Sequence, residues 1–171
     1  EAQCEGRVDY FDISYGSDPM QKLDIHYPKG SRNRPVIFFI HGGGWVMNDK
    51  DQSRFLGPKL VELGYVFVSI NYRLAPDNPH PAQIEDSAKA LKWVIDNINN
   101  YGGDPNRIGI TGHSSGGHLA ALLATGTKWH EKYEISSNKI KCWFPISGIY
   151  DLNLEENYYH PLMEGFTDSL F

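Results

Sequence analysis

The segment 107–121, RIGITGHSSGGHLAA, constrains the fold of this chain more than any other stretch. Ile108 and Ile110 lie in a short β-prone run, and the next residues, 112–116, include two glycines that interrupt it. Apolar side chains then recur at helical spacing, at Leu119, Leu122 and Leu123. The segment therefore predicts a strand, a tight turn and a helix in immediate succession.

Ser114 lies at the centre of this turn, in a Gly-x-Ser-x-Gly pattern that is typical of a nucleophile elbow. Such a turn strains its central residue, and the positions two before and two after must lack bulk because strand and helix nearly collide. Gly112 and Gly116 occupy those positions. The Ser114 hydroxyl would project at a helix N-terminus, where developing negative charge is stabilised. Such pentapeptides also arise by chance, but the strand-to-helix setting favours a catalytic serine.

A second pattern lies upstream, where the apolar run 36–40 follows Pro35 and precedes three consecutive glycines, 42–44. Continuous apolar character predicts a central strand that is buried on both faces. Glycines directly after such a strand leave backbone N–H groups uncovered. In acyl transfer these donors would face the oxygen that becomes negative, and one donor is worth roughly 2.7–4 kcal/mol. The glycine run could instead be a flexible turn, although its place after a buried strand favours the oxyanion interpretation.

Strands and helices are predicted to alternate along the rest of the chain. Two runs of alternating apolar and polar residues predict a first hairpin. The later continuous apolar runs predict further strands, and apolar side chains at helical spacing predict the helices between them. We expect strands at 7–15, 21–27, 36–40, 65–70 and 140–146 and a short one around Ile108 and Ile110, helices at 51–63, 82–100 and after the serine turn, and a surface loop at 126–139. This order predicts an α/β fold with a mainly parallel sheet and helices on both faces.

Composition describes one globular domain, 1–171, that is 40% hydrophobic with a formal net charge of −5. The mild acidity argues against nucleic acid and anionic membrane surfaces as partners, since both require clustered Lys and Arg. No apolar run approaches the ~18 residues of a membrane span. Cys4 and Cys142 could pair, but a buried free thiol at Cys142 is the favoured interpretation. The compartment is undecided, and a soluble, cytoplasmic protein is slightly favoured.

Four motifs in this order resemble the α/β-hydrolase fold, in particular the esterase and lipase branch that includes hormone-sensitive-lipase-like carboxylesterases. They are His41-Gly42-Gly43-Gly44-Trp45, Asn71-Tyr72-Arg73-Leu74-Ala75-Pro76, the run 101–107 and Gly112-His113-Ser114-Ser115-Gly116. The run 101–107 is also similar to isoprenylcysteine methylesterases, and 147–152 to kynurenine-formamidase-like proteins. The resemblance covers nearly the whole chain.

This resemblance implies a role for each motif residue. Ser114 would attack an ester carbonyl, and the acyl-enzyme would be released by water. The backbone N–H groups of Gly43, Gly44 and Ser115 would bind the oxyanion. The mouth of the pocket would be lined by Trp45, Tyr72 and His113. The alternative for such aromatic residues is a packing role alone. His41 would brace the glycine loop, and Asp86 would support the loop structurally.

A catalytic base and acid are not evident in the sequence, although a serine hydrolase of this fold needs both after the serine. His118 lies one helical turn beyond Ser114 and would point along the helix, and His130 and His160 are typical of surface histidines. Asp151 and Asp168 match no triad motif of the family. We therefore expect the base and acid to lie beyond Phe171, and the domain to be incomplete at its C-terminus.

Other chemistries have no motif in this sequence. Patterns for zinc, nucleotide and dinucleotide binding are missing, so neither a metal nor a cofactor is expected. Three hypotheses stay open: a carboxylesterase acting on small-molecule esters, a formamidase-type amide hydrolase, and a binding protein that has lost catalysis. Oligomeric state and substrate chain length are beyond the sequence.

Overall fold

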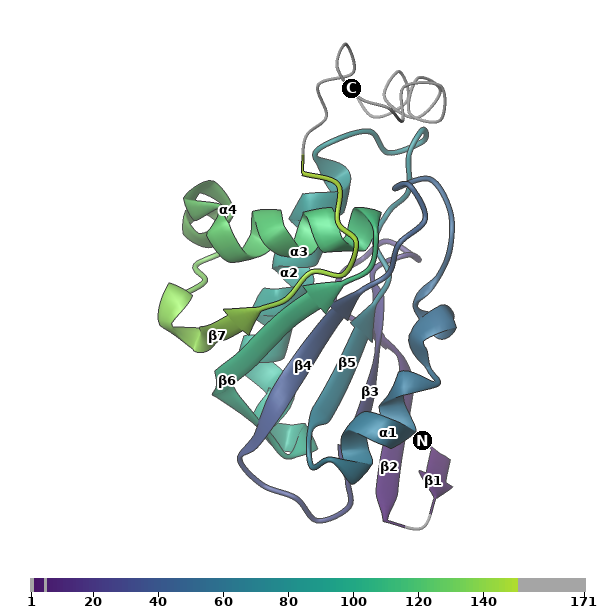
Figure 1. The fold of residues 1–171 in the computed structure, drawn as a ribbon, viewed down its shortest axis with the longest axis vertical. Helices are drawn as coiled ribbons and strands as arrows, with labels where there is room; N and C mark the ends of the chain where they lie inside the picture. The colour runs from purple at the N-terminus through teal and green to yellow at the C-terminus, as the bar shows by residue number, and fades with distance from the viewer. Residues whose placement is uncertain (1, 5, 151–171) are drawn as a thin grey trace.

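The computed structural model describes residues 2–4 and 6–150 of the chain, which form a twisted sheet covered by helices (Figure 1). The strands follow the order β1-β2-β3-β5-β4-β6-β7 across the sheet. They are β1 (Ala2–Cys4), β2 (Arg7–Ser14), β3 (Lys22–Pro28), β4 (Arg34–Ile40), β5 (Val66–Ile70), β6 (Gly103–Gly112) and β7 (Ile140–Trp143). Strands β5, β4, β6 and β7 pair in parallel, and β1, β2 and β3 extend the sheet with antiparallel pairs. The predicted α/β class and mainly parallel sheet are confirmed.

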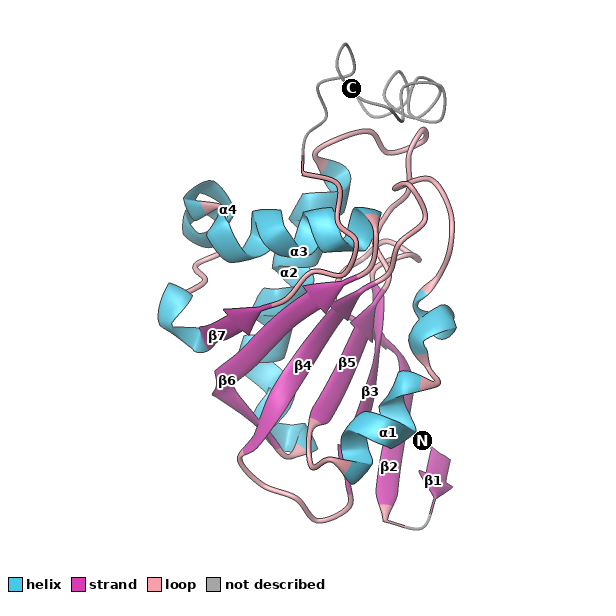
Figure 2. Ribbon diagram, in the orientation of Figure 1, coloured by secondary structure: helices cyan, strands magenta, loops and turns pink. Residues whose placement is uncertain are grey.

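Helices cover both faces of the sheet, as expected (Figure 2). One face carries α2 (Ala82–Asn97), α3 (Ser115–Thr125) and α4 (Thr127–Lys132), and the other carries α1 (Leu56–Glu62). Short 3-10 turns complete the chain: η1 (Lys50–Ser53), η2 (Ile98–Tyr101) and η3 (Ser137–Lys139). The main core lies between the sheet and α2 and α3, where the fully buried side chains include Phe38, Val68, Leu91 and Ile110. Burial of this apolar surface is the dominant stabilising term.

The register of the parallel strands determines where the loops meet. Ile40 of β4 pairs with Ile70 of β5 on one side and with Gly112 of β6 on the other. The carboxyl ends of the three strands are therefore level, and the segments that begin at His41, Asn71 and His113 emerge together at one edge. Ligand sites in open α/β sheets form at this edge.

Helix α1 departs from the predicted helix 51–63. The chain forms η1 first and then the short helix α1, and the apolar side chains of Phe55 and Leu63 are 74% and 68% exposed. The helix contacts the sheet through Gly57 and Val61 instead. A Cβ at Gly57 would lie 2.7 Å from Cγ of His26, so the close approach at this glycine determines which face of the helix is buried.

Two expectations near the last strand are wrong. The predicted surface loop 126–139 contains α4 and η3, because Trp129 and Ile135 are buried in the core and hold this segment against it. Cys142 is a free thiol, as expected, but it is exposed rather than buried. Among the described residues no strand pairs with the outer side of β7, which leaves Cys142 at the edge of the sheet.

Candidate active site

Ser114 connects β6 to α3 in a backbone conformation that L-amino acids rarely adopt. Its φ is 55° and its ψ is −120°, and α3 begins at the next residue. Strain of this kind persists only where the surrounding structure enforces it, and it is concentrated at functional sites. The turn is enforced by backbone hydrogen bonds from His113 N to Ile40 O (3.3 Å) and from Ser114 N to Ile146 O (2.9 Å).

The two glycines of the turn are required by close backbone contacts, as the sequence predicts. A Cβ at Gly112 would overlap the backbone of Gly116, and a Cβ at Gly116 would overlap the carbonyl oxygens of Ile40 and His41. The start of α3 therefore packs directly on the end of β4. The first N–H groups of a helix have no partner within the helix, so the amide of Ser115 lies where an anion would be stabilised.

The glycine loop after β4 lies beside Ser114. A Cβ at Gly42 would lie 3.2 Å from the Cβ of Ser114. The loop then turns with positive φ at Gly43 (125°) and Gly44 (60°), and it closes with hydrogen bonds from the amides of Val46 and Met47 to Gly43 O. The amides of Gly43 and Gly44 donate to no acceptor among the described residues. Two of the three expected oxyanion donors thus belong to a tightly wound loop adjacent to the serine.

His41 braces the base of this loop. Its Nδ1 donates a hydrogen bond of 2.8 Å to Gly42 O, and its ring stacks on Tyr72 with 4.3 Å between the ring centroids. The Tyr72 hydroxyl donates to His41 O at 3.0 Å. Burial lowers the pKa of His41 and raises that of Tyr72, so both side chains are held in their neutral forms.

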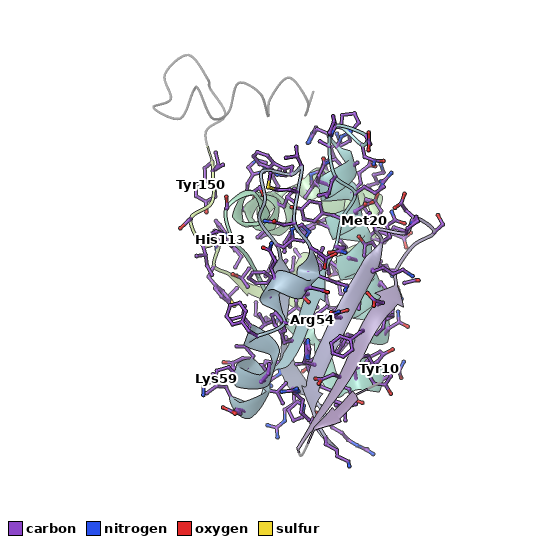
Figure 3. All side chains as sticks on the ribbon, turned by 90° about the vertical axis from the view of Figure 1, so that its right-hand side faces the viewer. Tyr10, Met20, Arg54, Lys59, His113 and Tyr150 are labelled. Carbon is purple, nitrogen blue, oxygen red and sulfur yellow. The ribbon has the colours of Figure 1, made fainter. Side chains whose placement is uncertain are left out.

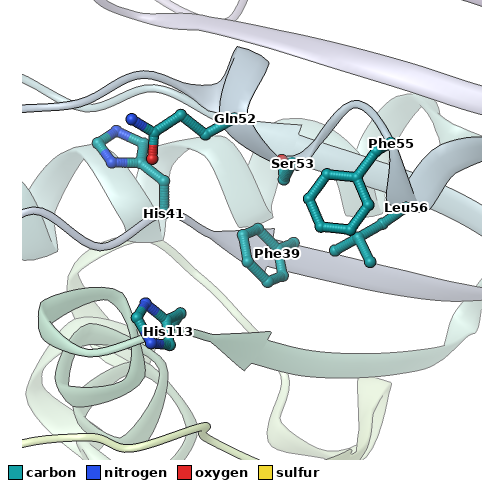
Figure 4. Close-up of a pocket in the computed structure, with 7 residues that line it drawn as sticks. All are labelled: Phe39, His41, Gln52, Ser53, Phe55, Leu56 and His113. Atoms are coloured by element: carbon teal, nitrogen blue, oxygen red, sulfur yellow. The ribbon is translucent and has the colours of Figure 1, made fainter.

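The residues expected at the mouth of the pocket differ in their exposure. Trp45 is 3% exposed and Tyr72 is fully buried, so both pack in the core beneath the loop. The Trp45 ring meets His118 edge to face at 5.2 Å. His113 is exposed and borders a pocket of about 190 Å³ together with Phe39, His41, Gln52, Ser53, Phe55 and Leu56 (Figure 4). Figure 4 shows His41 and His113 at one end of this pocket and Phe55 and Leu56 at the other.

Asp86 supports the segment after β5, which agrees with the structural role expected for it. Its carboxylate is 1% exposed and accepts hydrogen bonds from Arg73 N (2.9 Å), Nε (2.9 Å) and Nη2 (2.8 Å), and from Gln21 Nε2 (2.8 Å). The carboxylate raises the pKa of Arg73. Buried carboxylates need such partners, and this one fixes the backbone beside Tyr72.

No histidine side chain in residues 6–150 forms a hydrogen bond with Ser114. His118 packs on Trp45 and is joined to Ser114 only through the backbone, where its amide donates to Ser114 O at 3.1 Å. His130 interacts with Leu123 O at 2.6 Å through Nε2. The other candidates, His160, Asp151 and Asp168, lie outside the described residues.

Within the described ranges, no cluster of three His, Cys, Asp or Glu side chains could bind a metal ion. None of the described helices has the length and apolar character of a bilayer-spanning segment. A buried ion cluster surrounds Lys50, which lies nine residues after His41, and it was not predicted from the sequence. The sequence pattern that could have indicated this cluster is a lysine between two aspartates, Asp49 and Asp51, shortly after the glycine run.

A serine at a strained turn from strand to helix, beside a glycine loop at the carboxyl edge of a mainly parallel sheet, defines the α/β-hydrolase fold. Comparison with known proteins agrees. Residues 23–161 match the BD-FAE family profile, and the chain belongs to this family. The family assignment confirms the expected membership in the esterases of the α/β-hydrolase fold.

Curated relatives have esterase and formamidase names. The chain is 37% identical over 163 residues to the probable carboxylic ester hydrolase LipM of Mycobacterium tuberculosis, covering 89% of this chain and 37% of LipM. It is 34% identical over 153 residues to the isoprenylcysteine alpha-carbonyl methylesterase ICME of Arabidopsis thaliana, covering 86% of this chain and 36% of that protein. Kynurenine formamidase of Danio rerio is 36% identical over 142 residues, which cover 82% of this chain and 46% of the formamidase. The chain thus spans less than half of each relative.

Among solved structures, esterase B of Lactobacillus rhamnosis superposes with a TM-score of 0.83 at 27% identity. The superposition covers 97% of this chain and 56% of the esterase chain. The described fold is therefore that of a hydrolase over nearly its whole length.

Proposed function

We propose that this protein is a serine carboxylesterase in which Ser114 is the nucleophile. The observation that carries the proposal is the backbone of Ser114, which is held at φ 55° by hydrogen bonds to two neighbouring segments. The strained turn presents a half-buried hydroxyl at a helix N-terminus, beside the amides of Gly43 and Gly44, which donate to no acceptor among the described residues. The esterase names of LipM, ICME and esterase B support the same activity.

In the proposed reaction, Ser114 Oγ attacks the carbonyl carbon of an ester, and the carbonyl π electrons move onto oxygen. The amides of Gly43, Gly44 and Ser115 stabilise this oxyanion. The tetrahedral intermediate then expels the alcohol, which takes up the proton that left Ser114 through a general base. Water hydrolyses the acyl-enzyme and releases the carboxylic acid. The base and its carboxylate partner come from residues outside the described part of the chain.

Substrate contact is assigned to His113, which is exposed and borders the pocket. Trp45 and Tyr72, which the family resemblance assigned to the pocket mouth, act in this proposal by supporting the loop from below, because both are buried. The substrate is a small-molecule ester, and no cofactor takes part.

The test is covalent labelling of the full-length protein with a fluorophosphonate, followed by mapping of the modified residue. We expect labelling at Ser114, loss of labelling and of ester hydrolysis in Ser114→Ala, and retention of both in Ser137→Ala, which changes an exposed serine of η3. Removing a nucleophile of this type costs on the order of 10⁶ in kcat. An unlabelled parent protein would contradict the esterase proposal and favour a binding protein that has lost catalysis.

A formamidase is the second candidate, and the similarity to kynurenine formamidase favours it. It would use the same serine and the same oxyanion donors, so labelling does not distinguish it. The two activities are distinguished by comparing kcat/KM for an N-formyl aromatic amine with kcat/KM for a short-chain p-nitrophenyl ester. We expect the ester to be preferred, and a preference for the formamide would replace the first proposal.

A further inference from the structure

Lys50 is a buried cation with three carboxylate partners. The residue is 2% exposed, and its Nζ lies 2.8 Å from Asp12, 3.0 Å from Asp24 and 3.0 Å from Asp51. Arg54 contacts the same cluster, at 3.0 Å from Asp24 and 2.8 Å from Asp51. Burial alone would lower the pKa of Lys50, but the three carboxylates raise it, so the cation is retained. Buried cations are costly and persist only when they are paired in this way.

The cluster joins segments that are far apart in the sequence. Asp12 lies at a β-bulge of β2 with a φ of 58°, and Asp24 lies on β3. Lys50 is the first residue of η1, at the end of the loop that begins at His41. Figure 3 shows Arg54 beside the strands of this hairpin, and its guanidinium lies 4.5 Å from the centroid of the Phe11 ring of β2. The ion cluster therefore attaches the far end of the glycine loop to the N-terminal hairpin.

The backbone of Lys50 is fixed as firmly as its side chain. Its amide donates to Asn71 Oδ1 at 2.7 Å, and its carbonyl accepts from Ser53 Oγ at 2.7 Å. Asn71 directly follows β5 and donates in turn to Asp49 Oδ2 at 2.8 Å. The position of η1 relative to the carboxyl edge of the sheet is thus determined by Lys50 and its neighbours.

A short hydrogen-bonded path leads from η1 back to the glycine loop. Gln52 Nε2 donates to Asn48 Oδ1 at 2.8 Å, and Asn48 Nδ2 donates to Gly42 O at 3.3 Å. His41 Nδ1 binds the same carbonyl at 2.8 Å. Because a trans peptide is planar, its N–H points opposite to its carbonyl. The groups that bind Gly42 O therefore also set the direction of the Gly43 amide.

We propose that Lys50 is a positioning residue for the oxyanion donor Gly43 N–H, acting through η1, Gln52 and Asn48. This inference rests on the esterase function proposed above. An oxyanion donor must lie 2.7–3.1 Å from the developing charge, and a misplacement of about 1 Å can cost on the order of 10² in rate. The interaction grows as the oxyanion forms, so its loss lowers kcat more than it affects KM.

The first test compares Lys50→Met with Lys59→Met in the full-length protein. Lys59 is a matched control because its side chain is 78% exposed and lies at the rim of the molecule in Figure 3. Its one ion pair within the described part of the chain is with Glu62 of the same helix. We expect Lys50→Met to lower kcat for a short-chain ester by about 10–100-fold, and the rate of fluorophosphonate labelling by a similar factor. KM should change by less than about threefold, and Lys59→Met should match the parent.

The second test keeps the proposal falsifiable if Lys50→Met does not fold. Asn48 has a φ of 82°, so Asn48→Gly preserves the backbone and removes only the side-chain contacts to Gly42 and Gln52. Asn33, an exposed residue with a φ of 53°, provides the matched control Asn33→Gly. We expect Asn48→Gly to lower kcat by about tenfold, and Asn33→Gly to leave it unchanged.

Each outcome decides the question. A parental kcat in Lys50→Met or in Asn48→Gly overturns the positioning role, as does a loss confined to KM. A loss of kcat with unchanged KM in each variant that folds, measured well below its melting temperature, supports it. If the parent itself is not labelled at Ser114, the proposed function fails instead, so the two failures are distinguishable.

Discussion

At the scale of single residues, the burial of His41 makes the free energy of unfolding depend on pH. Its ring is 2% exposed, and Nε2 has no hydrogen-bond partner among the described residues, while Nδ1 donates to Gly42 O. A proton added at Nε2 would be buried without an acceptor. Burial accordingly lowers the pKa of His41 in the folded state.

Because this folded-state pKa lies below the unfolded value of about 6.5, the unfolded chain binds the proton first. The free energy of unfolding should therefore fall as the pH drops below about 6.5, with a slope of up to about 1.4 kcal/mol per pH unit from His41. Urea unfolding between pH 7.5 and pH 5 measures this, and the slope should be smaller in His41→Asn. Burial also lowers the pKa of His80 and His118, so the difference between parent and variant isolates His41. Equal slopes would show that His41 does not contribute.

Residues with purely local requirements could be predicted from the sequence, and residues with distant partners could not. Gly112, Ser114 and Gly116 were identified because the turn itself imposes their identities within five positions. Lys50 was missed because its partners Asp12 and Asp24 come from a hairpin that packs beside it only in the folded chain. The buried positions of Trp45 and Tyr72 likewise depend on how the loop folds back.

At the scale of elements, the strands were predicted well and the short helices poorly. Alternation and continuous apolar runs are properties of the sequence, so β2, β3, β4 and β5 were expected close to their observed ranges. The strand expected around Ile108 and Ile110 is longer than predicted, because β6 begins at Gly103. The orientation of α1 depends on Gly57 over His26, and α4 is held by the buried ring of Trp129. Both are tertiary contacts that override weak local preferences.

The contact between α3 and the end of β4 predicts a large effect of Gly116→Ala. The added methyl would overlap two backbone carbonyl oxygens, which cannot rotate away as a side chain can. We expect a loss of about 3 kcal/mol or more in the free energy of unfolding. Gly64→Ala is the control: its φ is +86° but its Cβ would lie 3.6 Å from Arg34, so it should cost only about 1–2 kcal/mol. Equal losses in urea unfolding would contradict the tight helix–strand contact.

At the scale of the whole molecule, buried polar networks connect the N-terminal hairpin to the carboxyl edge of the sheet. One network contains Lys50, and the other contains Asp86, which binds Gln21 from the hairpin region and Arg73 from the segment after β5. Both networks end at segments that lie next to the glycine loop. The hairpin therefore does more than extend the sheet, because it fixes the loops that surround Ser114.

This arrangement predicts that Asp86→Asn destabilises the whole fold, because it leaves the Arg73 guanidinium without its counter-charge. Removal of one partner from a buried ion pair costs about 3–5 kcal/mol, and we expect the lower end of this range because the Arg73 side chain is 26% exposed. Asp96→Asn is a matched control in the same helix, since Asp96 is half exposed. Among residues 6–150 its one ion pair is with Lys92 one turn away, an interaction worth about 0.3–0.5 kcal/mol. In the double variant Arg73→Met/Asp86→Asn, the loss should be smaller than the sum of the single losses, because neither charge is then left unpaired. Urea unfolding of the parent and of the four variants Asp86→Asn, Asp96→Asn, Arg73→Met and Arg73→Met/Asp86→Asn measures these differences. If Asp86→Asn were no more destabilising than Asp96→Asn, the Asp86 network would not hold the hairpin and the loop together, and the position of the site would have to depend on the apolar core alone.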